Sequence, residues 1–146
     1  MRKAVALILV AGLALAQAGQ KTYQAICQSC HQPTGAGIPG IFPPLAGHVP
    51  KILAKKGGRT YLISVVLYGL QGEIAVKGQK YNGVMPNFRA QLKDKDAADL
   101  LTYIATSWGN KLPAGQKPFT EAEVKAVRAK TLTPQKVLEL RKKLGL

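Results

Sequence analysis

The feature that most constrains this chain is the five-residue segment Cys27-Gln28-Ser29-Cys30-His31. The pattern C-x-x-C-H is typical of segments to which haem is covalently attached. Two thiols must add to two vinyl groups on neighbouring edges of one porphyrin, and a helical turn that carries them three residues apart fits that span. The next side chain, His31, is then placed to ligate the iron from one face. The segment therefore predicts one haem c, bonded to Cys27 and Cys30 and ligated by His31.

Three other interpretations of the two cysteines remain open. A thioredoxin-like redox pair would need a strand before it, whereas Gly, Lys, Thr and Tyr stand upstream of the motif. A zinc site could use Cys27, Cys30, His31 and His48, but the adjacent Cys30 and His31 fit one tetrahedron badly. A strained local disulfide is the third alternative, because an exported protein can oxidise its thiols.

The second axial ligand is predicted to be Met85. Electron carriers commonly use methionine on the second face of the iron, which raises the reduction potential. Once the leader described below is removed, Met85 is the only methionine left, and Gly83 and Pro86 favour a turn around it. The alternatives are that Met85 fills the core and that His48 is the ligand, although a lone histidine in such a loop is more often a surface or capping residue.

The amino terminus has the pattern of a secretory signal peptide. Met1-Arg2-Lys3 is followed by an apolar run from Ala4 to Leu15 and then by Ala16-Gln17-Ala18. The apolar run is shorter than the roughly 20 residues of a membrane helix, although an uncleaved anchor remains an alternative. We therefore assign residues 1–18 to the leader and expect a soluble periplasmic protein.

The chain is strongly basic. It holds 21 Lys and Arg against 7 Asp and Glu, a net charge of +14. Such a charge favours an acidic partner surface, because the summed field steers association. Nucleic acid is a common partner of basic chains, but export excludes it here.

The remaining pattern predicts a mostly helical chain. A helix is expected from about residue 21 into the motif, followed by a Gly- and Pro-rich loop. The apolar stretch 59–70 leaves helix and strand open, with its β-branched residues favouring strand. Further on, we expect a hairpin at 74–81 around Gly78, a helix at 94–108, and two short helices that begin at Thr120 and Thr133.

With the attachment motif and the segment Gly83-Val84-Met85-Pro86, the sequence resembles class I cytochromes c, and within them the Thermus-type cytochromes c552. The resemblance implies a mostly α fold around one haem, with a small β-hairpin and a helical carboxyl-terminal extension. It implies a haem domain at 19–109 and a basic extension at 110–146 that packs on the core. Pro43 would accept the hydrogen bond of the ligand histidine through its carbonyl, with Pro44 as a possible substitute.

The same resemblance implies a contact between the first and last helices of the haem domain. In this family a small residue and aromatic side chains pair across that contact. Gly19 and Tyr23 match the first helix, and Leu100 and Tyr103 match the last.

The function implied is one-electron transfer, not catalysis. A monomeric carrier of this kind docks transiently on membrane complexes and takes electrons from a quinol-oxidising complex to a terminal cytochrome c oxidase, here of the ba3 type. Ile26, Ile38 and Val84 match the positions around the haem edge, which predicts a docking surface with an apolar centre and a basic periphery. The alternatives are a small haem peroxidase or ligand-binding protein with a displaceable Met85, and an electron-entry module for one dehydrogenase.

Overall fold

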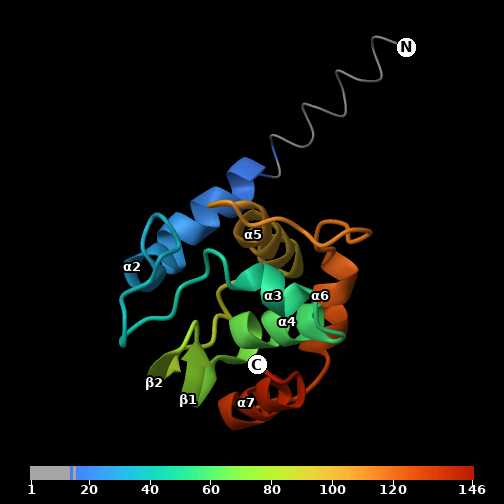
Figure 1. Ribbon diagram of the computed structural model, residues 1–146. Coiled ribbons are helices and arrows are strands. Elements are labelled where there is room, and N and C mark those ends of the chain that lie inside the picture. Colours follow the sequence, from blue (N-terminus) through green and yellow to red (C-terminus); the bar gives the residue numbers. More distant parts are fainter. Residues whose placement is uncertain (1–13, 15) are drawn as a thin grey trace, which may run out of the picture.

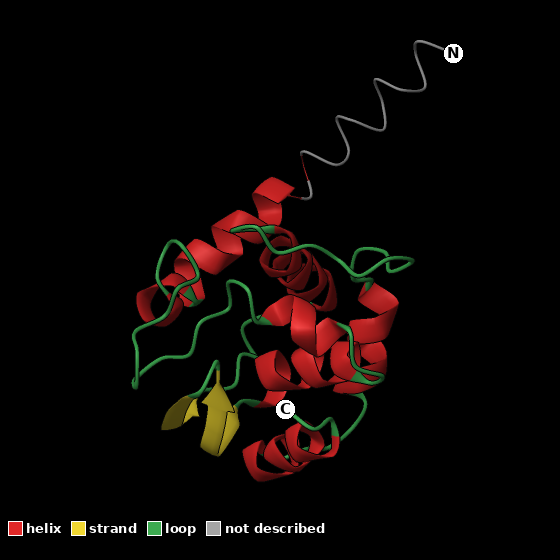
Figure 2. Cartoon of the chain, viewed as in Figure 1, coloured by secondary structure: helices red, strands yellow, loops and turns green. Residues whose placement is uncertain are grey.

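The computed structural model describes residue 14 and residues 16–146, so most of the predicted leader lies outside the described residues. Residues 16–26 are helical and lead through a turn at Cys27 into α2. The elements that follow are α2 (Gln28–His31), α3 (Val49–Leu53), α4 (Gly58–Tyr68), β1 (Leu70–Val76), β2 (Gln79–Met85), α5 (Asp94–Thr106), α6 (Glu121–Arg128) and α7 (Pro134–Lys143). The described chain is mostly helical with one small hairpin, as Figure 2 shows, which confirms the predicted fold class.

The amino-terminal helical segment lies against α5 (Figure 1), as expected for the first and last helices of the haem domain. A Cβ on Gly19 would stand 2.7 Å from the Cβ of Tyr103, so only glycine permits this approach. The buried ring of Tyr23 lies 5.6 Å from that of Tyr103. Trp108, predicted to end α5, instead adopts a left-handed backbone beyond the helix and places its ring 4.9 Å from Tyr23.

Most of the stretch 59–70 lies in the helix α4, which ends at Tyr68, so the preference for a strand was wrong there; Leu70 begins β1. The helix contacts α3, α5, α6 and α7, and most of its side chains are buried. A helix that is covered on nearly every side has no polar face, so its sequence shows no helical period. The buried hydroxyl of Ser64 in this helix donates to the carbonyl oxygen of Thr60 at 2.7 Å. Tertiary burial thus overrides the strand preference of its β-branched residues.

The predicted hairpin is confirmed and is longer than expected. β1 and β2 pair in antiparallel register from Leu70 opposite Met85 to Val76 opposite Gln79. Lys77 and Gly78 make the turn with φ of 51° and 79°, the backbone of a tight two-residue hairpin loop. Gly83 does not make the turn that we expected before Met85, because it lies within β2 opposite Gly72. Met85 therefore ends a strand and does not stand on a loop.

The carboxyl-terminal segment covers the core with two helices, as predicted. α6 begins with a complete capping box between Thr120 and Glu123 and packs on α4 and α5. α7 begins with Pro134 at its first turn and packs on β1 and α4. In Figure 1, α7 lies beside the hairpin, at the opposite side of the molecule from the amino-terminal helical segment.

Candidate haem site

The attachment segment is held as one helical turn. The backbone amide of Cys27 donates to the carbonyl oxygen of Tyr23, and that of His31 donates to the carbonyl oxygen of Cys27, both at 2.9 Å. Cys27 is buried and Cys30 is half-buried, and no disulfide joins them. Burial raises the pKa of the Cys27 thiol to about 12. A redox-active cysteine pair would need a depressed pKa, so this environment does not suit thioredoxin-like chemistry.

His31 is buried at the end of α2 and is oriented by the following loop. Its Nδ1–H donates to the carbonyl oxygen of Pro43 at 2.9 Å. The resemblance implied this contact for Pro43, with Pro44 as a substitute, and the acceptor is Pro43. Burial lowers the pKa of His31, while the Pro43 contact opposes this shift, so the ring is neutral near pH 7. No hydrogen bond to its Nε2 is present within the described chain. The ring therefore offers that nitrogen to a metal in the manner of a histidine ligand oriented by a carbonyl.

Met85 reaches the same region from the end of β2. The pairing of Leu70 with Met85 fixes the strand end beside the buried helix α4. The side chain is half-buried and packs against the hydrophobic core. The hairpin thus places the Met85 thioether at the end of a strand, whereas we expected it on a loop.

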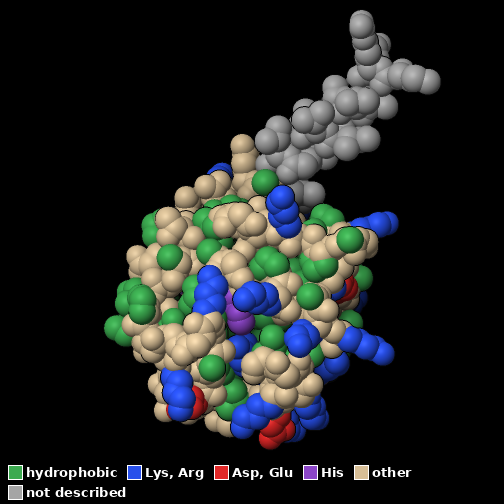
Figure 3. Space-filling view, in the orientation of Figure 1, with side chains coloured by type: hydrophobic (Ala, Val, Ile, Leu, Met, Phe, Trp, Pro, Cys, Tyr) green, Lys and Arg blue, Asp and Glu red, His purple; other side chains and the backbone are tan. Residues whose placement is uncertain are grey.

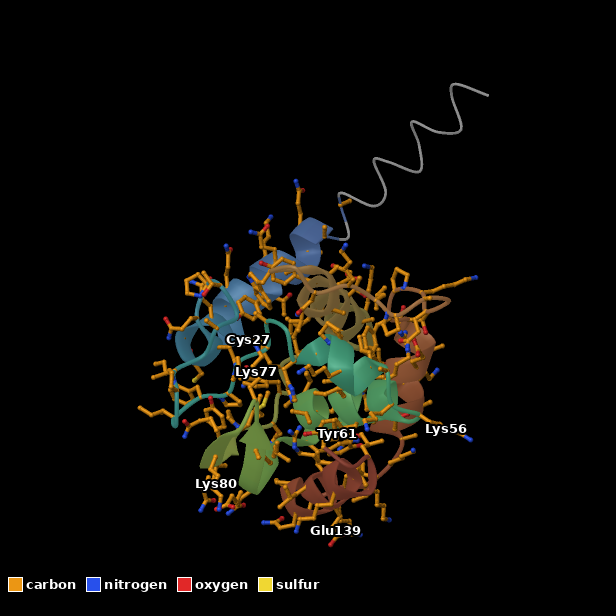
Figure 4. The ribbon with its side chains drawn as sticks, viewed as in Figure 1. Cys27, Lys56, Tyr61, Lys77, Lys80 and Glu139 are labelled. Carbon is orange, nitrogen blue, oxygen red and sulfur yellow. The ribbon has the colours of Figure 1, made fainter. Side chains whose placement is uncertain are left out.

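His31 and Met85 come from segments far apart in the chain and line one cavity. This cavity consists of two adjoining hollows that share His31, Pro43, Leu70, Ile74 and Met85. The outer hollow also contacts Cys30, Ile41 and Val84, and the inner hollow also contacts Cys27, His48, Tyr61 and Arg141. Figure 4 shows Cys27 and Tyr61 on elements far apart in the chain. We call the two hollows together the slot.

The residues of the slot fit a covalently attached haem. Two thiols stand in its wall, a neutral imidazole has its Nε2 unpartnered within the described residues, and a thioether comes from another segment. Most of the other lining side chains are apolar, as a porphyrin requires. Among residues 16–146 no three His, Cys, Asp or Glu side chains are grouped to hold a bare metal ion, so the structure does not bring Cys27, Cys30, His31 and His48 together as a zinc site would require.

His48 is neither a surface residue nor a side-chain cap, so that expectation was wrong. It precedes α3 without making a side-chain cap and is only 8% exposed. Its Nε2 lies 3.4 Å from Nη2 of Arg141, which α7 brings into the inner hollow. Burial, and then the charges of Arg141, Lys51 and Lys77, lower the pKa of His48 to about 4. Sequence reasoning missed Arg141, because nothing in the pattern of α7 marks one of its basic residues as buried.

No helix in the described part of the chain is long and apolar enough to cross a membrane.

The chain is similar to known cytochromes c. Residues 14–104 match the family model described as cytochrome c oxidase, cbb3-type, subunit III. The chain is 63% identical over 146 residues to a cytochrome c-552 of Thermus thermophilus, covering 99% of this chain and 98% of that protein. A second Thermus thermophilus cytochrome c-552 is 66% identical over 129 residues, which cover 88% of this chain and 97% of that protein.

A more distant relative belongs to a larger protein. The cytochrome c subunit of a quinone-dependent alcohol dehydrogenase from Gluconacetobacter polyoxogenes is 33% identical over 122 residues. The match covers 83% of this chain and only 24% of that subunit.

Proposed function

Because the chain belongs to the cytochrome c family, carries haem c and is an electron carrier, we propose that Cys27 and Cys30 attach the haem and that His31 and Met85 ligate its iron. The observation that carries this proposal is that His31 and Met85 line one slot with a cysteine in each of its hollows. Residues 19–109 then form the haem domain, and residues 110–146 form an extension that closes the slot on the side of α7.

The haem supplies an iron that alternates between the ferric and ferrous states. Residues of the protein act on the reduction potential of this iron and on its contact with water. The Pro43 carbonyl holds the His31 ring in one tautomer and orientation, which makes the imidazole a stronger donor. The thioether of Met85 favours a high reduction potential. The apolar wall excludes water, which favours a site that changes charge with little rearrangement.

Electrons are proposed to enter and leave at the outer hollow. Ile41 is 60% exposed and Val84 is 65% exposed, and both line the hollow that contains Cys30. Ile26 and Ile38, which the resemblance placed at the haem edge, are half-buried, and Ile41 was not anticipated. An apolar centre on a chain of net charge +14 combines long-range steering with a small dry contact.

The partners proposed are those of a periplasmic respiratory carrier. A quinol-oxidising complex would reduce the protein, and a terminal oxidase of the ba3 type would oxidise it. The kinship with a dehydrogenase subunit supports a second candidate, in which the protein accepts electrons from one dehydrogenase. Transient encounters with fast turnover favour the diffusible carrier, whereas a stoichiometric complex that survives gel filtration favours the second candidate.

The ligands are tested by visible and near-infrared spectra of protein matured with a cytochrome c assembly system, in both redox states. We expect sharp low-spin bands and a weak methionine-to-iron charge-transfer band, which Met85→Ala abolishes. Met85→Leu serves as the matched variant, because it keeps the apolar volume and removes only the sulfur. A high-spin spectrum in the unaltered protein, or a spectrum that Met85→Leu leaves unchanged, contradicts this ligation and favours a haem peroxidase or ligand-binding protein.

A further inference from the structure

Arg141 is a buried cation that has no acidic partner among the described residues. The residue is 3% exposed although it lies on α7, the last helix of the chain. Its Nη2 donates to the carbonyl oxygen of Ala75 at 2.9 Å, and its Nη1 donates to the hydroxyl of Tyr61 at 3.3 Å. Its Nε is buried and has no hydrogen-bond partner within the described chain. Burying a guanidinium is costly unless a counter-charge and a full set of acceptors accompany it.

Among the described residues, the charges that act on His48 beside Arg141 are all positive. Lys51 and Lys77 lie near enough to His48 to act on its titration together with Arg141. The four ion pairs within the described residues involve Arg59, Lys80, Lys95 and Arg128, and none reaches this cluster. Figure 3 shows basic side chains gathered around a small histidine surface on this face. The cluster therefore has the character of an anion site that no side chain of the described chain fills.

The cluster opens into the slot. Arg141, His48 and Tyr61 line the inner hollow together with Cys27, His31 and Met85. A haem carries its two propionate carboxylates on the edge away from its two vinyl groups. If the vinyl edge is bonded at Cys27 and Cys30, the carboxylate edge lies at a part of the slot remote from them. A guanidinium binds a carboxylate with two parallel hydrogen bonds, for which the unpartnered Nε of Arg141 is suited.

We propose that Arg141, oriented by Tyr61 and His48, binds a propionate of the haem and so fastens α7 to the haem domain through the cofactor. This inference rests on the proposed attachment at Cys27 and Cys30. The neutral His48 ring accepts from Arg141 and holds the guanidinium in place. Tyr61 accepts from Arg141 and keeps its own hydroxyl proton for the carboxylate. The carboxyl-terminal helix thereby becomes part of the cofactor site.

A cation at this place also acts on the iron. Positive charge near the haem disfavours the ferric state, which carries one more positive charge than the ferrous state. Removing Arg141 is therefore expected to lower the midpoint potential. It is also expected to loosen α7, because the helix loses its link to the cofactor.

The experiment compares Arg141→Leu with Lys142→Leu in the matured holoprotein. Lys142 is the next residue of α7 and is exposed, so the control removes the same charge from the same helix. In Arg141→Leu we expect the ratio of reduced to oxidised protein at a fixed applied potential to fall about tenfold, which is about 59 mV for a one-electron couple. Amide hydrogens of α7 should exchange faster in this variant. Lys142→Leu should change neither quantity appreciably.

Several outcomes would overturn the proposal. If Arg141→Leu and Lys142→Leu keep low-spin spectra and have equal midpoint potentials and equal hydrogen exchange of α7, the proposal is contradicted. If the wild-type spectrum shows no ligation by His31 and Met85, the proposed function is contradicted instead. If Arg141→Leu does not fold, Arg141→Lys replaces it, because lysine keeps the charge but cannot make the bidentate contact. Hydrogen exchange of α7 at the wild-type rate in Arg141→Lys would then contradict the proposal. Titrating the wild-type holoprotein with inorganic phosphate at constant ionic strength should leave the potential unchanged. A saturable shift would assign the cluster to a free anion.

Discussion

The Nδ1 of His31 lies 2.9 Å from the carbonyl oxygen of Pro43. This contact joins the attachment helix to the loop that follows it, and it determines which ring nitrogen faces the slot. The loop is itself held by backbone hydrogen bonds, among them those from the amides of Leu45 and Ala46 to the carbonyl oxygen of Gly35. The orientation of the proposed iron ligand therefore depends on the shape of a loop that contributes no ligand.

Gly37→Ala is expected to disturb that contact. A Cβ at Gly37 would collide with the carbonyl oxygen of Phe42 and stand 2.7 Å from the carbonyl carbon of Pro43, on a backbone with φ of +64°. We expect the free energy of unfolding to fall by about 2 kcal/mol. The midpoint potential should rise, because a less firmly hydrogen-bonded imidazole donates less to the ferric iron. Denaturant unfolding and a potentiometric titration measure the two effects.

Gly78→Ala is the matched control for Gly37→Ala. Gly78 has φ of +79°, and a Cβ added there would have no atom within 4 Å, so alanine suffers the backbone strain without the collision. We expect a smaller loss of stability, about 1 kcal/mol, and an unchanged potential. A potential that moves equally in both variants would show that strain, and not the Pro43 contact, acts on the site.

Tyr23→Phe tests the other anchor of the attachment helix. The Tyr23 side chain is fully buried, and its hydroxyl donates to the carbonyl oxygen of Gln32 at 2.6 Å, just beyond α2. Losing this bond leaves a carbonyl poorly satisfied and should cost about 1 kcal/mol in unfolding free energy. Tyr103→Phe is the control, because the Tyr103 hydroxyl makes no hydrogen bond within the described residues. Equal stabilities of the two variants would show that the Tyr23 hydroxyl adds nothing.

The sequence was most informative where chemistry or local signals dominate. The motif Cys27–His31 indicates the cofactor, because few cofactors need two thiols and an imidazole at that spacing. The capping box at Thr120 and the Lys77–Gly78 turn mark a helix start and a hairpin by local hydrogen bonding and backbone preference. Such elements could be placed from their own residues.

The sequence was least informative where burial depends on distant segments. α4 lacks a helical period because several other elements cover it, so its β-branched residues were misleading. Arg141 is one of three consecutive basic residues in α7, and only the docking of that helix on β1 and α4 distinguishes it from its exposed neighbours. His48 likewise contacts Arg141 of α7, which lies far from it along the chain. Contacts between segments far apart in the chain leave no signal in the local sequence.

Glu123→Gln should weaken the acid dependence of stability. Glu123 receives hydrogen bonds from Arg59 at 2.7 and 2.8 Å, and chiefly these bonds lower the pKa of Glu123 to about 2. A carboxyl whose pKa is lower in the folded state contributes stability above its unfolded pKa, near 4.5, and loses that contribution as the pH falls towards 2. Because the pair is partly exposed, we expect a loss of about 1 kcal/mol at pH 7.

The comparison for Glu123→Gln is Glu139→Gln. Glutamine at position 123 can still complete the capping box, so the substitution removes mainly the charge. Glu139 is exposed on α7 (Figure 4) and forms no ion pair within the described residues. Unfolding curves collected between pH 7 and pH 2 should converge for Glu123→Gln and the wild type at the acid end. Parallel curves across the whole range would contradict the assigned coupling.

Val84→Asp is expected to slow electron transfer to an isolated terminal oxidase of the ba3 type about tenfold, because a charge at the apolar centre of the outer hollow must be desolvated on docking. Val84 is 65% exposed, so folding and the low-spin spectrum should be unaffected. Ala126→Asp adds the same charge on the exposed side of α6, away from the slot, and should alter the rate only slightly through the net charge. Stopped-flow rates measured over a range of ionic strengths separate the two effects. A steep loss of the wild-type rate with salt, or equal rates for the two variants, would show that ion pairs at the rim carry the docking and that the apolar centre does not.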